Sequence, residues 1–250
     1  MSSPDTPDTP GKPYHRPLNP YGDSGVFHAA GHGADIASER RDALDESALQ
    51  WARRWREAHP EEHPVVWDMG CGNAAQSLAM AQRGAWVIGI DQFPPDPGVH
   101  TEKVVGEGRF RFIQEKLEDM MDSGQANPLP FAHAFFSQRT LHYLPYATAF
   151  RLLQHLRTRA HPDACLFVSC SGLLSELGNG YPNAPIAQRF SVLSPDMADK
   201  HHIYAPVCLY TEAEFMALIA ASGWTVSTAY TSQFGNIKVT AFLRRPDCCI

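Results

Sequence analysis

The sequence predicts an α/β protein with a doubly wound, mostly parallel sheet of seven strands that ends in an antiparallel C-terminal hairpin strand. Two observations predict this class. Continuous apolar runs alternate with segments of helical spacing, which is typical of parallel strands covered by helices on both faces. The last two runs instead alternate apolar and polar residues, which indicates an antiparallel pair. The 250 residues show no internal repeat, so we expect one domain over residues 21–250.

Composition and charge exclude several classes of function. The net charge is −6, with no block of Lys or Arg, so capture of nucleic acid is not expected. No apolar stretch approaches the roughly 20 residues that span a bilayer, and the N-terminus lacks the apolar core of a signal peptide. The six cysteines form no CxxC pair. We therefore expect a cytoplasmic protein that acts on a small molecule, as a monomer or homodimer, with no membrane partner.

The first elements are a tail and a helix. Residues 1–20 carry six prolines and almost no large apolar residues, which predicts a disordered tail. A helix is expected over residues 35–59, where Ala48, Trp51, Ala52 and Trp55 follow the spacing of one apolar stripe.

Five apolar runs predict the parallel strands, at residues 64–69, 85–90, 109–114, 131–137 and 164–170. Between the last two, Pro145 is expected to begin a helix whose apolar face consists of Ala149, Leu152, Leu153, Leu156 and Ala160.

After the fifth strand the pattern lapses over residues 173–207, a length typical of a lid over a site. A helix follows at residues 211–223, where Thr211 and Glu214 predict a capping box and Gly223 the end. The antiparallel pair at residues 224–230 and 236–243 completes the sheet.

The stretch "VVWDMGCGNAAQSLAMAQRGAWVIGIDQF", residues 65–93, points to a ligand site. Gly70 and Gly72 allow the backbone to approach a ligand, and Asn73 is expected to start a helix with free N–H groups. Asp91 is placed to accept hydrogen bonds from a ribose diol. Residues 70–75 also match the dinucleotide pattern G-x-G-x-x-A, but Asp68 would repel a pyrophosphate. It suits a cationic ligand such as S-adenosylmethionine.

At this point the chain resembles the class I S-adenosylmethionine-dependent methyltransferases, which have a Rossmann-like fold. The resemblance rests on "VVWDMGCGNA", "VIGID", "FFSQRTLHYLP" and the terminal hairpin, and covers roughly residues 40–245. It is greatest to small-molecule methyltransferases of the ubiquinone-biosynthesis type. It implies that S-adenosylmethionine is the cofactor and S-adenosylhomocysteine the product. The cofactor-binding residues implied are Asp68, Gly70, Cys71, Gly72, Asn73, Asp91, Gln92, Leu117, Ser137 and Gln138. Lys116 and Leu117 depart from the family's usual adenine contact, for which Glu118 or a backbone N–H could substitute.

The acceptor side offers several polar and aromatic candidates. His142 is the favoured base or orienting group, with a structural histidine as the alternative. Arg139 would either clamp an anionic acceptor or balance the net negative charge. The expected substrate-binding residues come from the lid and from the segment before the first strand: Tyr21, His28, Tyr181, Arg189, His202 and Tyr204. No metal site is expected, because adjacent histidines such as His201 and His202 diverge.

Three functions compete on this sequence. The first is methyl transfer to an O, N or S nucleophile of a small molecule by in-line displacement. The second is an S-adenosylmethionine-binding regulatory protein without transfer activity. The third, a nicotinamide-dependent oxidoreductase, is disfavoured by Asp68.

Overall fold

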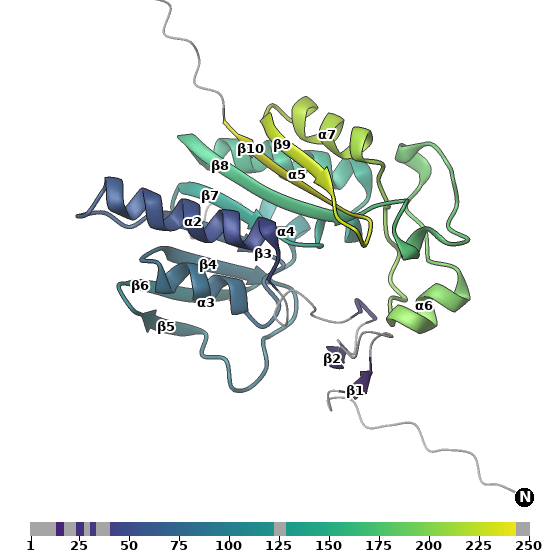
Figure 1. Cartoon of the computed structure of the whole chain (residues 1–250), viewed down its shortest axis with the longest axis horizontal. Coiled ribbons are helices and arrows are strands. Elements are labelled where there is room, and N and C mark those ends of the chain that lie inside the picture. The colour runs from purple at the N-terminus through teal and green to yellow at the C-terminus, as the bar shows by residue number, and fades with distance from the viewer. Residues whose placement is uncertain (1–13, 18–23, 28–30, 34–40, 123–128, 244–250) are drawn as a thin grey trace, which may run out of the picture.

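The computed structural model describes residues 14–17, 24–27, 31–33, 41–122 and 129–243. Its centre is an eight-stranded sheet in the order β5-β6-β4-β3-β7-β8-β10-β9 (Figure 1). The strands are β3 (Val65–Met69), β4 (Trp86–Asp91), β5 (Glu102–Val105), β6 (Gly108–Gln114), β7 (Ala132–Ser137), β8 (Ala160–Ser171), β9 (Thr225–Thr231) and β10 (Asn236–Phe242). The predicted fold class is confirmed.

The five apolar runs form the parallel part of the sheet, β6-β4-β3-β7-β8. From β3 the chain adds strands first on one side, through β4 and β6, and then on the other, through β7 and β8. The strand order therefore reverses beside β3, which is where ligands bind in such sheets. β10 lies antiparallel between β8 and β9, as the alternating pattern predicts.

Helices cover both faces of the sheet (Figure 1). The helices α2 (Ala43–Ala58) and α3 (Ala75–Gln82) cover one face, where Leu44, Leu49 and Met80 pack on strand residues such as Val66. The opposite face is covered by α4 (Leu117–Asp122), α5 (Tyr146–Thr158) and α7 (Glu212–Ala221) in the larger core around Trp67. Burial on both faces explains why the central strands read as unbroken apolar runs.

Several predicted boundaries need correction. An eighth strand, β5, pairs antiparallel with β6 at the edge. It has only four residues, two of them charged, and is largely exposed, so it has no apolar run from which a strand could be predicted. Ala160 does not belong to the preceding helix, because α5 ends at Thr158 and Ala160 begins β8. α3 begins at Ala75, after the left-handed Ala74, rather than at Asn73.

The capping box of Thr211 and Glu214 is present at the start of α7, as predicted. A second box, made by Asp42 and Asp45, caps α2. The predicted helix over residues 35–59 is therefore α2 from Ala43 onward, since residues 34–40 lie outside the described part of the chain.

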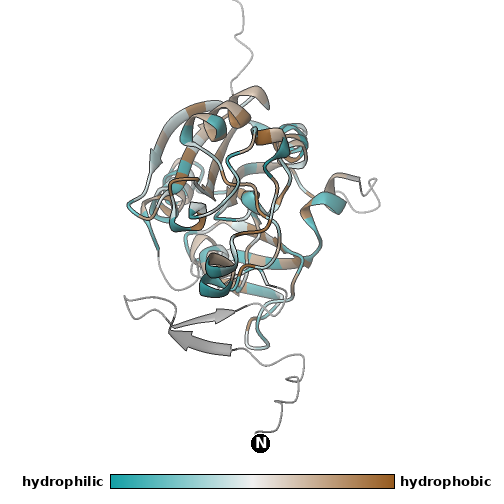
Figure 2. Ribbon diagram, turned by 90° about the vertical axis from the view of Figure 1, so that its right-hand side faces the viewer, coloured by the Kyte–Doolittle hydropathy of each residue, from teal (hydrophilic) through white to brown (hydrophobic). Residues whose placement is uncertain are grey.

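The predicted lid contains short helices, namely η2 (Glu176–Gly178), η3 (Ile186–Gln188) and α6 (Pro195–His201). Figure 1 shows α6 beyond one end of the sheet, apart from the helices that flank it, and Figure 2 views the molecule from that end. Within the predicted tail, β1 (Tyr14–Pro17) pairs antiparallel with β2 (Ser24–Phe27). The rest of residues 1–20 lies outside the described residues.

Candidate functional site

A cavity of about 880 Å³ opens where the parallel strands end. Its walls come from the loops after β3, β4, β6, β7 and β8, the turn between β9 and β10, and the lid. Of the predicted site residues, ten line it: Asp68, Gly70, Cys71, Gly72, Asp91, Gln92, Leu117, Gln138, Arg139 and His142. Residues from four separate strand ends therefore meet at one place.

The glycine loop after β3 has an unusual backbone. Gly70, Gly72 and Ala74 have φ values of +71°, +50° and +60°. A Cβ on Gly70 would lie 2.1 Å from the Oγ1 of Thr140, so no other residue fits there without displacement. Gly70 thus serves two needs at once, a left-handed conformation and close contact with the loop after β7.

Two carboxylates flank this loop. Asp68 is buried at the end of β3, and its Oδ2 accepts a hydrogen bond of 2.6 Å from the Ser77 hydroxyl. Asp91 ends β4, and its two oxygens accept backbone N–H groups of Gly72 and Phe93, each at 3.0 Å. Each carboxylate oxygen of Asp91 can accept a further bond, because it carries two acceptor sites.

Beyond Asp91 the wall is partly aromatic. Phe93 and Tyr143 both line the cavity, and the ring of His32 packs against them at centroid distances of 5.3 and 4.9 Å. Leu117, at the start of α4, adds an apolar side chain to the same wall. A flat base would find ring faces and apolar surface here.

His142 lies in the wall of the cavity and is buried. It is 2% exposed, and burial, with a further contribution from Arg139, lowers its pKa to about 3. Its Nδ1 accepts the backbone N–H of Ser171 at 3.4 Å, which places the proton of the neutral ring on Nε2. A neutral His142 can therefore donate a hydrogen bond from Nε2, which favours the predicted orienting role, and its role as a base stays a prediction.

Two predicted cofactor residues support the site without lining the cavity. The hydroxyl of Ser137, which is buried, donates to the backbone oxygen of Met69 at 2.9 Å and joins β7 to β3. Asn73 bonds Asp96 through both atoms of its amide, which fixes the loop after β4 against the glycine loop.

A buried polar network, unrecognised in the sequence, adjoins Gln138. The Nε2 of Gln138 donates to the Oδ1 of Asp45 at 2.5 Å, and its Oε1 accepts from the Nζ of Lys238 at 2.9 Å. Lys238 also pairs with Asp42, the N-cap of α2. Burial raises the pKa of Asp45 to about 6. The available signal was a lone lysine in the last strand segment, residues 236–243, at a polar position of its alternating pattern.

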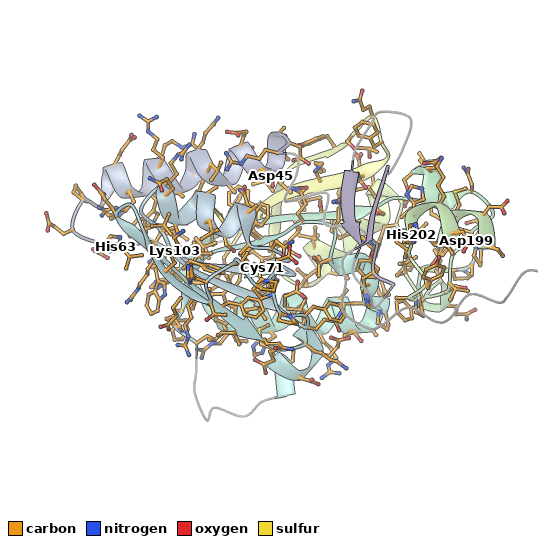
Figure 3. All side chains as sticks on the ribbon, turned by 90° about the horizontal axis from the view of Figure 1, so that it is seen from below. Asp45, His63, Cys71, Lys103, Asp199 and His202 are labelled. Atoms are coloured by element: carbon orange, nitrogen blue, oxygen red, sulfur yellow. The ribbon has the colours of Figure 1, made fainter. Side chains whose placement is uncertain are left out.

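The predicted lid residues lie elsewhere. The hydroxyl of Tyr181 contacts the backbone oxygens of Arg189 and Val207, and Arg189 makes a bidentate pair with Glu214 at 2.7 and 2.9 Å. Both side chains are thus internal anchors of the lid and do not line the cavity. His202 and Tyr204 do not line it either. Figure 3 shows His202 beside Asp199, at the far end of the molecule from His63. Tyr21 and His28 lie outside the described residues.

The lid contributes other side chains to the cavity. Glu176 on η2 pairs with Lys200 and His201 on α6, and all three line the cavity. Leu174 lies at its rim. These contacts join η2 to α6, which are separated in the sequence, so the local sequence pattern does not predict them.

The described ranges contain no group of three or more His, Cys, Asp or Glu side chains placed to hold a metal ion. Over those same ranges, no helix has the length and apolar character needed to cross a membrane.

Comparison with known proteins identifies the fold. No protein-family model matches the sequence, and no curated protein sequence matches it significantly. Among similar solved structures is an S-adenosylmethionine-dependent methyltransferase from Methanosarcina mazei, with a TM-score of 0.53 and 18% identity over 75% of this chain and 96% of that one. Another, from Mesorhizobium loti, has a TM-score of 0.52 and 16% identity over 80% and 100%.

A third similar structure is the 1,6-didemethyltoxoflavin N1-methyltransferase of Burkholderia thailandensis, determined with 1,6-didemethyltoxoflavin and S-adenosylhomocysteine bound. Its TM-score is 0.51, with 16% identity over 84% of this chain and 81% of that chain. The chain therefore has the Rossmann-like fold of the S-adenosylmethionine-dependent methyltransferases, as its sequence motifs suggest.

Proposed function

We propose that the protein is an S-adenosylmethionine-dependent methyltransferase that acts on an O, N or S nucleophile of a small molecule. The observation that carries this proposal is the convergence of the Gly70 loop, Asp68 and Asp91 on one cavity. The similarity in fold to methyltransferases supports it.

The residues present fit the cofactor. Because Gly70 has no Cβ, Thr140 packs directly against it, and the glycine loop and the loop after β7 meet at the edge of the cavity. Asp91 would hold the ribose hydroxyls, and Asp68 would face the cationic methionine portion. The bound cofactor supplies a methyl group already activated by its sulfonium. The protein then has to orient the acceptor and exclude water, which a cavity partly walled by the lid favours.

An S-adenosylmethionine-binding regulatory protein is the alternative. The cavity extends well past the cofactor-binding residues, to the turn between β9 and β10 and to the lid, which leaves space for a second molecule. That extra space favours an enzyme. Asp68 is buried beside the glycine loop, where it would oppose a pyrophosphate, so a nicotinamide cofactor is disfavoured.

Thermal unfolding with S-adenosylhomocysteine, S-adenosylmethionine or NADH tests the proposal. At about 100 times the dissociation constant a ligand adds roughly 2.7 kcal/mol, a rise on the order of 5 to 10 °C. We expect this rise with the first two ligands only, and expect Asp91→Ala to abolish it. Glu61→Ala, which removes an exposed carboxylate before β3, is the control and should keep it. A rise with NADH alone would overturn the proposal.

A further inference from the structure

Three adjacent strands carry polar residues on one face, where the sheet borders the cavity. Lys238 on β10 lies opposite Ser169 on β8 and Tyr230 on β9, and Asn236 lies opposite Ser171. Residues opposite each other in antiparallel pairs point to the same face. Of this set, together with the neighbouring Ser232, five line the cavity and are called the polar wall: Ser171, Tyr230, Ser232, Asn236 and Lys238.

Lys238 is the centre of the polar wall. It is 2% exposed, and its ammonium group donates to Asp42 and to the Oε1 of Gln138. An ammonium group has three N–H donors, so one remains without an acceptor among the residues that the structure describes. The Oδ1 of Asp42 is meanwhile occupied by the N–H of Leu44 at 2.8 Å. Burying a lysine is costly, and a neutral wall would pack here without that cost.

Further donors accompany Lys238. The Tyr230 hydroxyl makes no hydrogen bond within the described part of the chain, and neither does the amide nitrogen of Asn236, whose Oδ1 accepts from the Ser171 hydroxyl at 3.4 Å. Burial, aided by the carboxylates of Asp42 and Asp45, raises the pKa of Tyr230, so that its phenol keeps its proton. The polar wall therefore offers three hydrogen-bond donors to whatever occupies the cavity.

The charges that line the cavity balance. Its described lining has five cationic side chains (Arg41, Lys116, Arg139, Lys200 and Lys238) and five carboxylates (Asp42, Asp68, Asp91, Glu118 and Glu176). The whole chain has a net charge of −6, so the cavity is less negative than the average. Lys238 is the cation of the polar wall, and low-dielectric walls strengthen the attraction of its ammonium group for an anion.

The rim beside the polar wall is apolar. Leu174 is 90% exposed and Phe234 is 50% exposed, yet both line the cavity. Their loops are joined by a hydrogen bond of 3.0 Å from the N–H of Gly172 to the backbone oxygen of Gly235. Large apolar side chains held at the mouth of a cavity are typical of a site for an apolar ligand body.

We propose that the polar wall is the acceptor subsite, and that it takes a small molecule with a flat apolar body and an anionic oxygen. The oxygen, of a carboxylate or an ionised phenol, accepts hydrogen bonds from Lys238, Tyr230 and Asn236, while Leu174 and Phe234 cover the body. That this ligand is the methyl acceptor rests on the proposed function. The binding of an anionic oxygen by the polar wall does not depend on that function.

Benzoate and its neutral isostere benzamide are the probes, titrated by ligand-observed NMR in the presence of S-adenosylhomocysteine. We expect the wild type to bind benzoate at least tenfold more tightly than benzamide. Lys238→Met should abolish that preference, and Lys103→Met, at an exposed position on β5, should leave it unchanged. Tyr230→Phe removes a hydroxyl that has no partner among the described residues and so should fold normally, and it should weaken benzoate binding at least threefold.

Thermal unfolding of the same samples separates this inference from the proposed function. Stabilisation by S-adenosylhomocysteine with equal affinity for benzoate and benzamide overturns the acceptor subsite alone. A benzoate preference that depends on Lys238, without any stabilisation by S-adenosylhomocysteine, supports the anion site and overturns the methyltransferase proposal. A preference that survives both Lys238→Met and Tyr230→Phe also overturns the inference.

Discussion

At the scale of single residues, position 70 is one where only glycine fits without displacement of its neighbours. Gly70→Ala places a methyl group 2.1 Å from the Oγ1 of Thr140 at a φ of +71°. Left-handed strain and overpacking together should cost about 2–4 kcal/mol. We expect urea unfolding to show this loss, with S-adenosylhomocysteine binding reduced in parallel. The control is Gly98→Ala, where no atom lies within 4 Å of the added Cβ. Equal stability of the two variants would contradict this account of the loop.

The sequence predicts the positions of some site residues but not the contacts of others. Gly70, Asp68 and Asp91 lie at the ends of readable apolar strands, so their convergence follows from the fold class. Gln138 was placed near the cofactor, but its bonds to Asp45 and Lys238 join residues 93 and 100 positions apart. No local pattern encodes such a partnership. The low pKa of His142 likewise depends on complete burial, which its neighbours in the sequence do not determine.

At the scale of elements, the lid is held to α7 by one buried pair. Arg189 donates to both carboxylate oxygens of Glu214, and also to the backbone oxygen of Leu209 at 3.0 Å. Although burial favours the neutral acid, the bonds from Arg189 and Thr211 hold the pKa of Glu214 below its ordinary value. The pair thus fixes the lid through a residue that also caps a helix.

Arg189→Met should therefore destabilise the protein by about 3–5 kcal/mol, because it leaves a partly buried carboxylate without its partner. Arg53→Met breaks an exposed pair with Glu57 on α2 and should cost less than about 0.5 kcal/mol. Urea unfolding of both variants measures the difference, and limited proteolysis should cut the lid faster in Arg189→Met only. Similar unfolding midpoints would show that the lid has another anchor.

The sequence predicts the buried helices and strands better than the exposed or short ones. The runs that became β3, β4 and β7 are covered on both faces, so nearly every position had to be apolar. β5 is an exposed edge strand, where charged residues protect against unwanted pairing, and it escaped detection for that reason. α6 begins with Pro195 and has only seven residues, which is too short for helical spacing to show. Residue type alone predicts a substrate-binding role for Tyr181 and Arg189, whereas their contacts are made within the lid and to α7.

At the scale of the whole molecule, three titratable groups, two of them buried and His133 partly buried, shape the dependence of the free energy of unfolding on pH. Burial, together with His161 and His59, lowers the pKa of His133 to about 4, and the pKa of His142 is about 3. Both histidines have a lower pKa in the folded protein than the 6.5 of the unfolded chain, so the free energy of unfolding decreases as the pH falls below 6.5. Asp45 acts oppositely. Its folded pKa of about 6 exceeds the unfolded 3.8, so it adds stability as the pH falls through 6.

These groups together bind one more proton in the unfolded state between pH 6 and 5. As the pH decreases from 6 to 5, these groups should therefore lower the free energy of unfolding by roughly 1.4 kcal/mol. Asp45→Asn should steepen the slope toward about 2.7 kcal/mol per unit, and His133→Gln should flatten it. Urea titrations at pH 6.0, 5.5 and 5.0 measure the slopes. A slope unchanged by either substitution would show that neither group titrates with the stated pKa.

The position of β10 has a consequence for how the chain is made. β8 must pair with residues 236–242, but Asn236 follows its partner Ser171 by 65 positions. At about 5–20 residues per second, a ribosome exposes the bare edge of β8 for several seconds before its partner emerges. Lys238 arrives with that strand, so the polar wall is assembled late in synthesis. The glycine loop, which follows β3, is therefore synthesised well before the polar wall is complete.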